Sequence, residues 1–250
     1  MTISKNQLKI LAAYRLQKKC DSDGLFVVEG EKMCDEALSS GFVIRTICAT
    51  DDWLSSRKHI LPLECDCYEV DNAILERLSS QRSPNKAWML LERANPRPQP
   101  KGIALTLALD GLQDPGNMGT ILRIADWFGI RNIMCSMNTV SCYNSKVVQS
   151  SMGSIFRTTV SYCNLNSYLS EAQSSGISVY GAMLDGDNLY TSELKTPAIL
   201  VIGNEGNGIS AETLGMISHK LTIPNYGKTC ESLNAATATA VLCSEFARRV

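Results

Sequence analysis

The chain has 250 residues, of which 44% are hydrophobic and 20% are charged, and its formal net charge is −1. This composition is typical of a folded globular protein of one or two domains and excludes a largely disordered chain. The near-zero net charge gives no sign of a nucleic-acid partner, so any RNA-binding surface has to be local.

Two local segments are strongly basic. Residues 1–19 carry five Lys or Arg and no acidic residue, and residues 81–101 carry five Lys or Arg against one Glu, a net +4. Segments of this kind can neutralise RNA phosphates. A solvated helix face and a charged linker are the alternative interpretation.

The sequence contains ten cysteines but only two histidines, His59 and His219. Cys65 and Cys67 form the one close pair, so a zinc site lacks ligands at suitable spacing and no metal is expected. The chain shows no secretory segment and no apolar run of membrane-spanning length. We therefore expect a cytoplasmic protein with reduced thiols, most of them buried as small hydrophobic side chains.

Residues 1–95 predict a small α/β domain. A Pro-rich segment at 96–102 holds the chain extended and predicts a linker. Within the first domain, helices are expected at 4–19, 30–40 and 72–78, and strands at 25–28, 43–49 and 87–91.

Residues 103–250 alternate strands and helices, which predicts a mostly parallel sheet with helices on both faces. Ligands bind such sheets at the carboxyl ends of the strands. Strands are expected at 103–109, 132–135, 158–161, 177–181 and 198–202, with a further strand ending at Pro224, and helices at 117–128, 144–152, 165–175, 209–217 and 232–248.

The first strand of this domain runs into a Pro-Gly turn, and Asn117 is expected to cap the helix that follows. At 100° per residue, one stripe of this helix is apolar, and Arg123 falls on the opposite side beside Trp127. This pairing indicates a second contact surface, for a partner subunit or an RNA backbone. An ordinary exposed arginine is the alternative.

A glycine-rich loop follows the strand at 198–202. Gly203, Gly206 and Gly208 would allow the backbone to approach a ligand closely, and Glu205 could orient a base or an arginine. The spacing matches neither the dinucleotide fingerprint nor a phosphate-binding loop. A plain loop is the alternative.

The last motif joins a strand end to the C-terminal helix. The strand ends at Pro224, and Ser232 or Asn234 is expected to open the helix. Its first turns are rich in Ala and Thr, which predicts close packing. A capped C-terminal helix with no further role is the alternative.

Together these segments resemble the three motifs of the SpoU/TrmH family of the SPOUT superfamily of RNA methyltransferases, and the resemblance covers 103–250. Residues 1–95 resemble, more loosely, the family's N-terminal substrate-binding domain, a small α/β RNA-binding fold akin to ribosomal proteins. This chain departs from the family with Asn225 in place of the usual Met and with the Ala/Thr run after Asn234. The matching residues are Asn117, Gly119 and Arg123 in the first motif, Gly203, Glu205 and Gly208 in the second, and Ile223, Pro224, Ser232, Leu233 and Asn234 in the third.

The resemblance implies a parallel α/β domain with a deep trefoil knot, assembled as a homodimer through the helices of the first and third motifs. It further implies S-adenosylmethionine as cofactor and methylation of a ribose 2′-oxygen in RNA, with 23S-type large-subunit ribosomal RNA favoured over tRNA. The implied cofactor-binding residues are Gly203, Ile223 and Leu233.

The resemblance also implies roles in catalysis. Arg123 would activate the 2′-hydroxyl. Because a guanidinium rarely loses a proton, we expect it to clamp a phosphate and stabilise the developing alkoxide. Asn117 and Glu205 would orient Arg123 or the ribose, and Ser232 and Asn234 would hold the cofactor loop and the substrate.

Two other functions stay open at this point. A non-catalytic RNA-binding protein could keep the fold, although it would be expected to lose motif side chains. A base methyltransferase acting on tRNA could share the fold, although its motifs differ. The glycine spacing disfavours a nucleotide-binding oxidoreductase.

Overall fold

The structure is a computed structural model that describes residues 2–81, 83, 85–93, 105–227, 229 and 231–249. The predicted Pro-rich linker at 96–102 lies outside these residues. The chain forms two compact units: unit 1 comprises Met1–Asn95 and Tyr143–Phe156, and unit 2 comprises Pro96–Cys142 and Arg157–Val250.

Unit 1 is built on a four-stranded mixed sheet in the order β1-β4-β2-β3. β4 is antiparallel to both β1 and β2, whereas β2 and the edge strand β3 are parallel. Its elements are α1 (Lys5–Ala12), the 3-10 helix η1 (Ala13–Arg15), α2 (Gln17–Asp23), β1 (Leu25–Glu29), α3 (Glu31–Leu38), β2 (Ile44–Ala49), α4 (Asp51–Arg57), β3 (Asp66–Glu69), α5 (Asn72–Leu78), β4 (Ala87–Glu92), α7 (Ser145–Ser150) and the 3-10 helix η2 (Ser154–Phe156).

The single helix expected at 4–19 was wrong, because the chain breaks at Leu16, whose backbone is extended (φ −91°, ψ 121°). In a continuous helix, Cys20 would lie 180° around the axis from Leu11. The break allows both side chains to enter the same hydrophobic core. Beyond it, the Tyr14 hydroxyl donates a hydrogen bond to Asp23 at 2.7 Å.

The segment Tyr143–Phe156 packs on unit 1 although it lies between two strands of unit 2 in sequence. α7 contacts β1. The Phe26 ring lies 4.7 Å from that of Tyr143, and the Phe42 ring lies 5.4 Å from that of Phe156, between ring centroids. Aromatic pairs at these distances are stabilising, so the segment is an integral part of unit 1.

Unit 2 is built on a six-stranded sheet in the order β10-β8-β9-β5-β6-β7, in which all neighbours are parallel. The predicted fold class, a parallel α/β domain preceded by a small α/β domain, is confirmed. The elements of unit 2 are β5 (Leu105–Leu109), α6 (Pro115–Trp127), β6 (Asn132–Ser136), β7 (Thr159–Cys163), α8 (Leu165–Ser174), β8 (Ser178–Asn188), β9 (Ala198–Ile202), α9 (Ala211–Leu214), β10 (His219–Thr222) and α10 (Ala235–Arg248).

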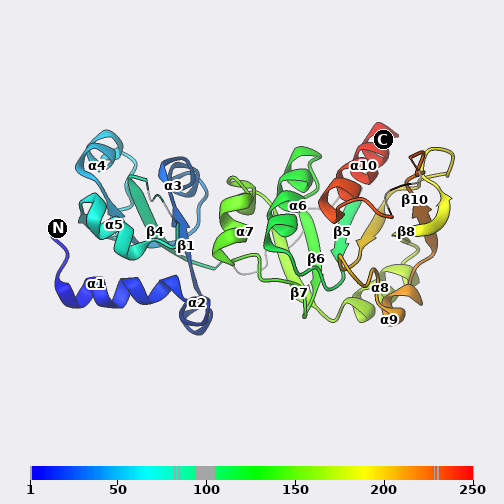
Figure 1. The fold of residues 1–250 in the computed structure, drawn as a ribbon, viewed down its shortest axis with the longest axis horizontal. Helices are drawn as coiled ribbons and strands as arrows, with labels where there is room; N and C mark the ends of the chain where they lie inside the picture. The colour runs from blue at the N-terminus through cyan, green and yellow to red at the C-terminus, as the bar shows by residue number, and fades with distance from the viewer. Residues whose placement is uncertain are drawn as a thin grey trace. The chain divides into compact units, whose positions relative to one another are not determined.

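Helices cover both faces of this sheet, with α6 and α10 on one side and α8 and α9 on the other (Figure 1). The predicted apolar stripe of α6 is fully buried. β10 forms one edge of the sheet, and the chain then returns so that α10 packs against α6, the helix that follows central strand β5. The trefoil knot implied by the resemblance requires a return of this kind.

None of the nine cysteines in the described part of the chain forms a disulfide, and six of the nine side chains are buried. Burial raises the pKa of the Cys34 and Cys135 thiols, which keeps both protonated and unreactive. Among the residues that the structure describes, no His, Cys, Asp or Glu side chains gather as a metal site. Within the same residues, no helix has the length and hydropathy needed to cross a membrane.

Candidate active site

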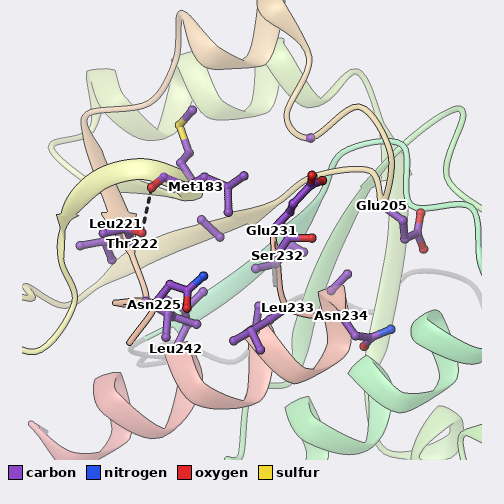
Figure 2. Close-up of a pocket in the computed structure, with 18 of the residues that line it drawn as sticks. Met183, Glu205, Leu221, Thr222, Asn225, Glu231, Ser232, Leu233, Asn234 and Leu242 are labelled. Atoms are coloured by element: carbon purple, nitrogen blue, oxygen red, sulfur yellow. Dashed lines mark hydrogen bonds between the residues drawn. The ribbon is translucent and has the colours of Figure 1, made fainter. Parts of the chain in front are cut away.

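A cavity of about 620 Å³ opens in unit 2 where the middle of β8 and the loops after β9 and β10 meet the start of α10 (Figure 2). Parallel α/β sheets bind their ligands at the carboxyl ends of the strands, and the cavity lies on that side of this sheet. Six of the eight predicted site residues line the cavity: Gly203, Glu205, Ile223, Ser232, Leu233 and Asn234.

Backbone hydrogen bonds join the two ends of the loop after β9. The amide of Asn204 donates to the Gly208 carbonyl and the amide of Gly208 donates to the Asn204 carbonyl, both at 2.9 Å. A Cβ at Gly203 would lie 2.3 Å from the Gly208 carbonyl carbon, so only glycine permits this closure. The Asn204 side chain then donates to the Gly111 carbonyl at 2.7 Å and ties the loop to the end of β5.

The helix of the first motif begins two residues earlier than predicted. Asp114, not Asn117, is the N-cap, because the Asp114 carboxylate accepts a 2.8 Å hydrogen bond from the Asn117 amide and Pro115 occupies the first helical position. The expectation that Asn117 caps this helix was therefore wrong. Its side chain is left available for contacts outside the helix.

That side chain joins the three motifs. The Asn117 Nδ2 donates to Glu205 at 2.9 Å, and the Asn117 Oδ1 accepts from the Asn234 Nδ2 at 2.8 Å. The Asn234 Oδ1 in turn accepts from the amides of Ala236 and Thr237 at 3.0 and 3.2 Å and caps α10. Because each amide uses both its donor and its acceptor, the chain of bonds fixes both side-chain orientations.

Glu205 is held by three donors from the first motif. Besides Asn117, the backbone amides of Gln113 and Asp114 donate to its carboxylate at 3.1 and 3.0 Å. Burial opposes ionisation of this carboxyl, but the hydrogen bonds outweigh burial and lower its pKa. Glu205 is therefore an anion at neutral pH and acts as an acceptor that anchors the turn before α6.

Arg123 lies outside this cavity lining. It is exposed on α6, six residues after Asn117, which corresponds to about 9 Å along the helix axis. Trp127, one turn further, is 85% exposed. Within the described part of the chain, the guanidinium makes no hydrogen bond or ion pair, so it is available to a ligand or a partner. Neither Asn117 nor Glu205 bonds to Arg123 in this structure, and the other expected role of these two residues, orienting the ribose, stays a prediction.

Asn225, where the resemblance leads one to expect Met, lines the cavity. Its Oδ1 accepts a hydrogen bond from the Gly227 amide at 3.0 Å, which forms a turn that a Met side chain would not make.

Sequence reasoning missed three residues of the site: Asp114, Asn204 and Glu231. An Asp directly before Pro is a common helix start and could have identified Asp114. Asn204 acts through a carbonyl 93 residues away, which no local spacing reveals. Glu231 precedes the Ser-Leu-Asn of the third motif and lines the cavity.

Comparisons with known proteins identify the family of the chain. The model of the SpoU rRNA Methylase family matches residues 104–244, and that of the MRM3-like substrate binding domain matches residues 5–88. The chain is 30% identical to the 23S rRNA (guanosine(2553)-2′-O)-methyltransferase RlmP of Bacillus subtilis, over 96% of this chain and 95% of that protein.

Two solved structures share the whole architecture. A TrmH-family protein from Porphyromonas gingivalis superposes with a TM-score of 0.90 at 40% identity, over all of both chains. An AdoMet-bound rRNA methyltransferase from Sinorhizobium meliloti superposes with a TM-score of 0.87 at 27% identity, over 100% of this chain and 97% of that one. With the family match over more than half of the chain and the three motifs joined at one cavity, the chain belongs to the SpoU rRNA methylase family.

Proposed function

We propose that this protein transfers a methyl group from S-adenosylmethionine to a ribose 2′-oxygen of large-subunit ribosomal RNA. The observation that carries the proposal is the hydrogen-bonded chain Glu205–Asn117–Asn234, which holds all three family motifs at the edge of one cavity. The relative from Bacillus subtilis is a 23S rRNA 2′-O-methyltransferase, and its length matches that of this chain.

The cavity fits the cofactor. Its volume of about 620 Å³ suits a ligand of this size, and apolar side chains such as Leu221, Leu233 and Leu242 can pack against an adenine ring. Among the described residues, no Lys or Arg lines it to bind the phosphates of a dinucleotide. Gly203, Ile223 and Leu233 would hold the adenosine part. The bound cofactor supplies an activated methyl group on a positively charged sulfur.

The chain's own residues then have to position the 2′-hydroxyl and stabilise charge on its oxygen. Arg123 clamps an RNA phosphate and stabilises the nascent alkoxide, a role that its exposure and lack of protein partners among the described residues support. Asn117 and Glu205 fix the turn that carries α6, while Ser232 and Asn234 hold the loop around the cofactor.

Unit 1 recognises the RNA. Its match to a substrate-binding domain supports this role, and so does a group of exposed basic side chains that can contact phosphates. These are Lys5, Lys9, Arg15 and Lys18. An enzyme acting on ribosomal RNA works where ribosomes assemble, so the proposal places the protein in the cytoplasm, as a homodimer.

The proposal is tested by transfer of labelled methyl groups to purified ribosomal RNA and tRNA. We expect wild type to label ribosomal RNA, Arg123→Ala to lose at least about 100-fold in rate, and Arg123→Lys to retain part of the activity because it keeps the charge. Arg131→Ala is the matched control, since Arg131 is also an exposed arginine of unit 2.

Equal inactivity of the Lys and Ala variants would contradict a simple charge role for Arg123. Labelling of tRNA alone would replace the ribosomal substrate. No labelling of either RNA, with no binding of S-adenosylmethionine by calorimetry, would favour a non-catalytic RNA-binding protein.

A further inference from the structure

Among the described residues, the charged side chains that line the cavity are all acidic. Two carboxylates line it, those of Glu205 and Glu231, whereas no Lys, Arg or His does so among the residues that the structure describes. A cavity of this kind favours a ligand that carries positive charge.

The two carboxylates differ in how they are used. Glu205 accepts hydrogen bonds from three N–H donors of the turn before α6, so its charge is already compensated by the protein. Within the described residues, the carboxylate of Glu231 has no hydrogen bond and no ion pair. Glu231 is therefore the lining carboxylate whose charge is left for a ligand.

Glu231 lies in the segment that leads into α10. It stands three residues before Asn234, which is held on one side by Asn117 and on the other by the first amides of α10. Figure 2 shows the Glu231 carboxylate, in this view, between Glu205 and the side chains of Met183 and Thr222. A carboxylate in the cavity lining can interact electrostatically with a charged ligand bound there.

We propose that Glu231 is a specificity-determining residue that selects the positively charged methyl donor over its neutral product. This inference rests on S-adenosylmethionine being the cofactor. In the reaction, the bond from methyl carbon to sulfur breaks, a carbon–oxygen bond forms, the 2′-hydroxyl proton passes to solvent water, and the sulfur keeps the electron pair. The sulfonium thus becomes an uncharged thioether.

Donor and product share the same adenosine and the same amino-acid tail, so they differ at this site mainly by one methyl group and one charge. A carboxylate near the sulfur is attracted electrostatically to the positive charge of the donor, whereas the uncharged sulfur of the product offers no such attraction. Glu231 would therefore favour binding of fresh donor and release of spent product, without taking part in the transfer itself.

The test is calorimetric binding of three ligands at low salt: S-adenosylmethionine, S-adenosylhomocysteine, and sinefungin, an analogue with an amine-bearing carbon in place of the sulfonium. We expect Glu231→Gln to weaken binding of the two cationic ligands about five- to tenfold and to change binding of S-adenosylhomocysteine less than twofold. Glu171→Gln, which removes another exposed carboxylate of unit 2, on α8 and outside the cavity lining, should leave all three affinities unchanged.

A second measurement needs no variant. Raising the salt concentration should reduce the wild-type preference for donor over product, because exposed charges are screened. An unchanged donor-to-product ratio in Glu231→Gln would overturn the inference, as would an effect confined to the KM for RNA, which would assign Glu231 to the target base. If wild type bound none of the three ligands, the cofactor assignment itself would fail, and this inference with it.

Discussion

At the scale of single residues, the Asn117 side chain makes two hydrogen bonds that link the motifs. Its amide donates to Glu205 and accepts from Asn234, so two different substitutions are needed to separate the effects of these bonds. Asn117→Ala removes both, and we expect about a 10- to 100-fold loss in kcat/KM, the value of one or two such bonds. Asn117→Asp keeps the acceptor but places a second carboxylate against Glu205, so we expect a larger loss than with Ala.

Methyl transfer to ribosomal RNA measures both losses, and thermal unfolding shows whether the variants remain folded. Asn207→Ala is the matched control, because Asn207 is an exposed amide in the same loop as Glu205 and its side chain makes no bond with the described residues. Near wild-type activity of Asn117→Asp would show that the bond to Glu205 does not hold the site together.

The sequence assigned Asn117 to the first motif but not to its actual contacts. Asp and Asn are equally good helix caps, so the local pattern could not decide between Asp114 and Asn117. The partners of the Asn117 side chain lie 88 and 117 residues away and reach it only through the order of the strands. Residue types could therefore be predicted from the motifs, whereas their bonds required the tertiary structure.

At the scale of elements, α10 is fastened at its C-terminal end by Glu245. The carboxylate accepts from Arg248 at 2.6 Å and from Arg249 at 2.6 Å, and the Arg249 guanidinium also donates to the Leu189 and Tyr190 carbonyls. Hydrogen bonds from Arg248 and Arg249 lower the pKa of Glu245 to about 2. These bonds tie the last helix to the segment that follows β8.

An unfolded Glu has a pKa of about 4.3, so the lowered pKa of Glu245 means that its bonds to Arg248 and Arg249 stabilise the fold above that pH. This stabilisation is lost as the pH falls toward 2. We expect Glu245→Gln to lower the melting temperature by about 2–4 °C at pH 7, the equivalent of about 1 kcal/mol. The difference from wild type should shrink steadily between about pH 4.5 and 2. Thermal melts across this range measure it, with Glu171→Gln as control, and a difference independent of pH would contradict this origin.

Helices and strands with a clear periodicity of hydrophobic residues were predicted well, and those without such a periodicity were not. α5 and β9 begin and end at the predicted residues. β3 was missed because only Tyr68 of its four residues is buried, so it shows little alternation. β8 runs well past the predicted 177–181, and a Cβ at Gly186 within it would lie 2.8 Å from the Lys220 backbone, a closeness that only the pairing with β10 explains.

At the scale of the whole molecule, the alternation of strands and helices was enough to predict a parallel sheet but not its strand order. The packing of Tyr143–Phe156 on unit 1 also had no local signal, because its contacts to Phe26 and Phe42 span more than 100 residues. The domain boundaries predicted at the Pro-rich segment stay a prediction.

The proposed homodimer is argued from α6. Its inner face is fully buried, whereas its outer face exposes Trp127 by 85% next to Arg123. A large aromatic side chain loses favourable burial when left in water, and such residues are enriched in the centres of interfaces. We expect wild type to have the mass of two 27.3 kDa chains by light scattering and Trp127→Glu to have the mass of one. Leu63→Glu changes a fully exposed apolar residue in unit 1 and should remain dimeric. A single-chain mass for wild type, or an unchanged dimer with Trp127→Glu, would exclude this face as the interface.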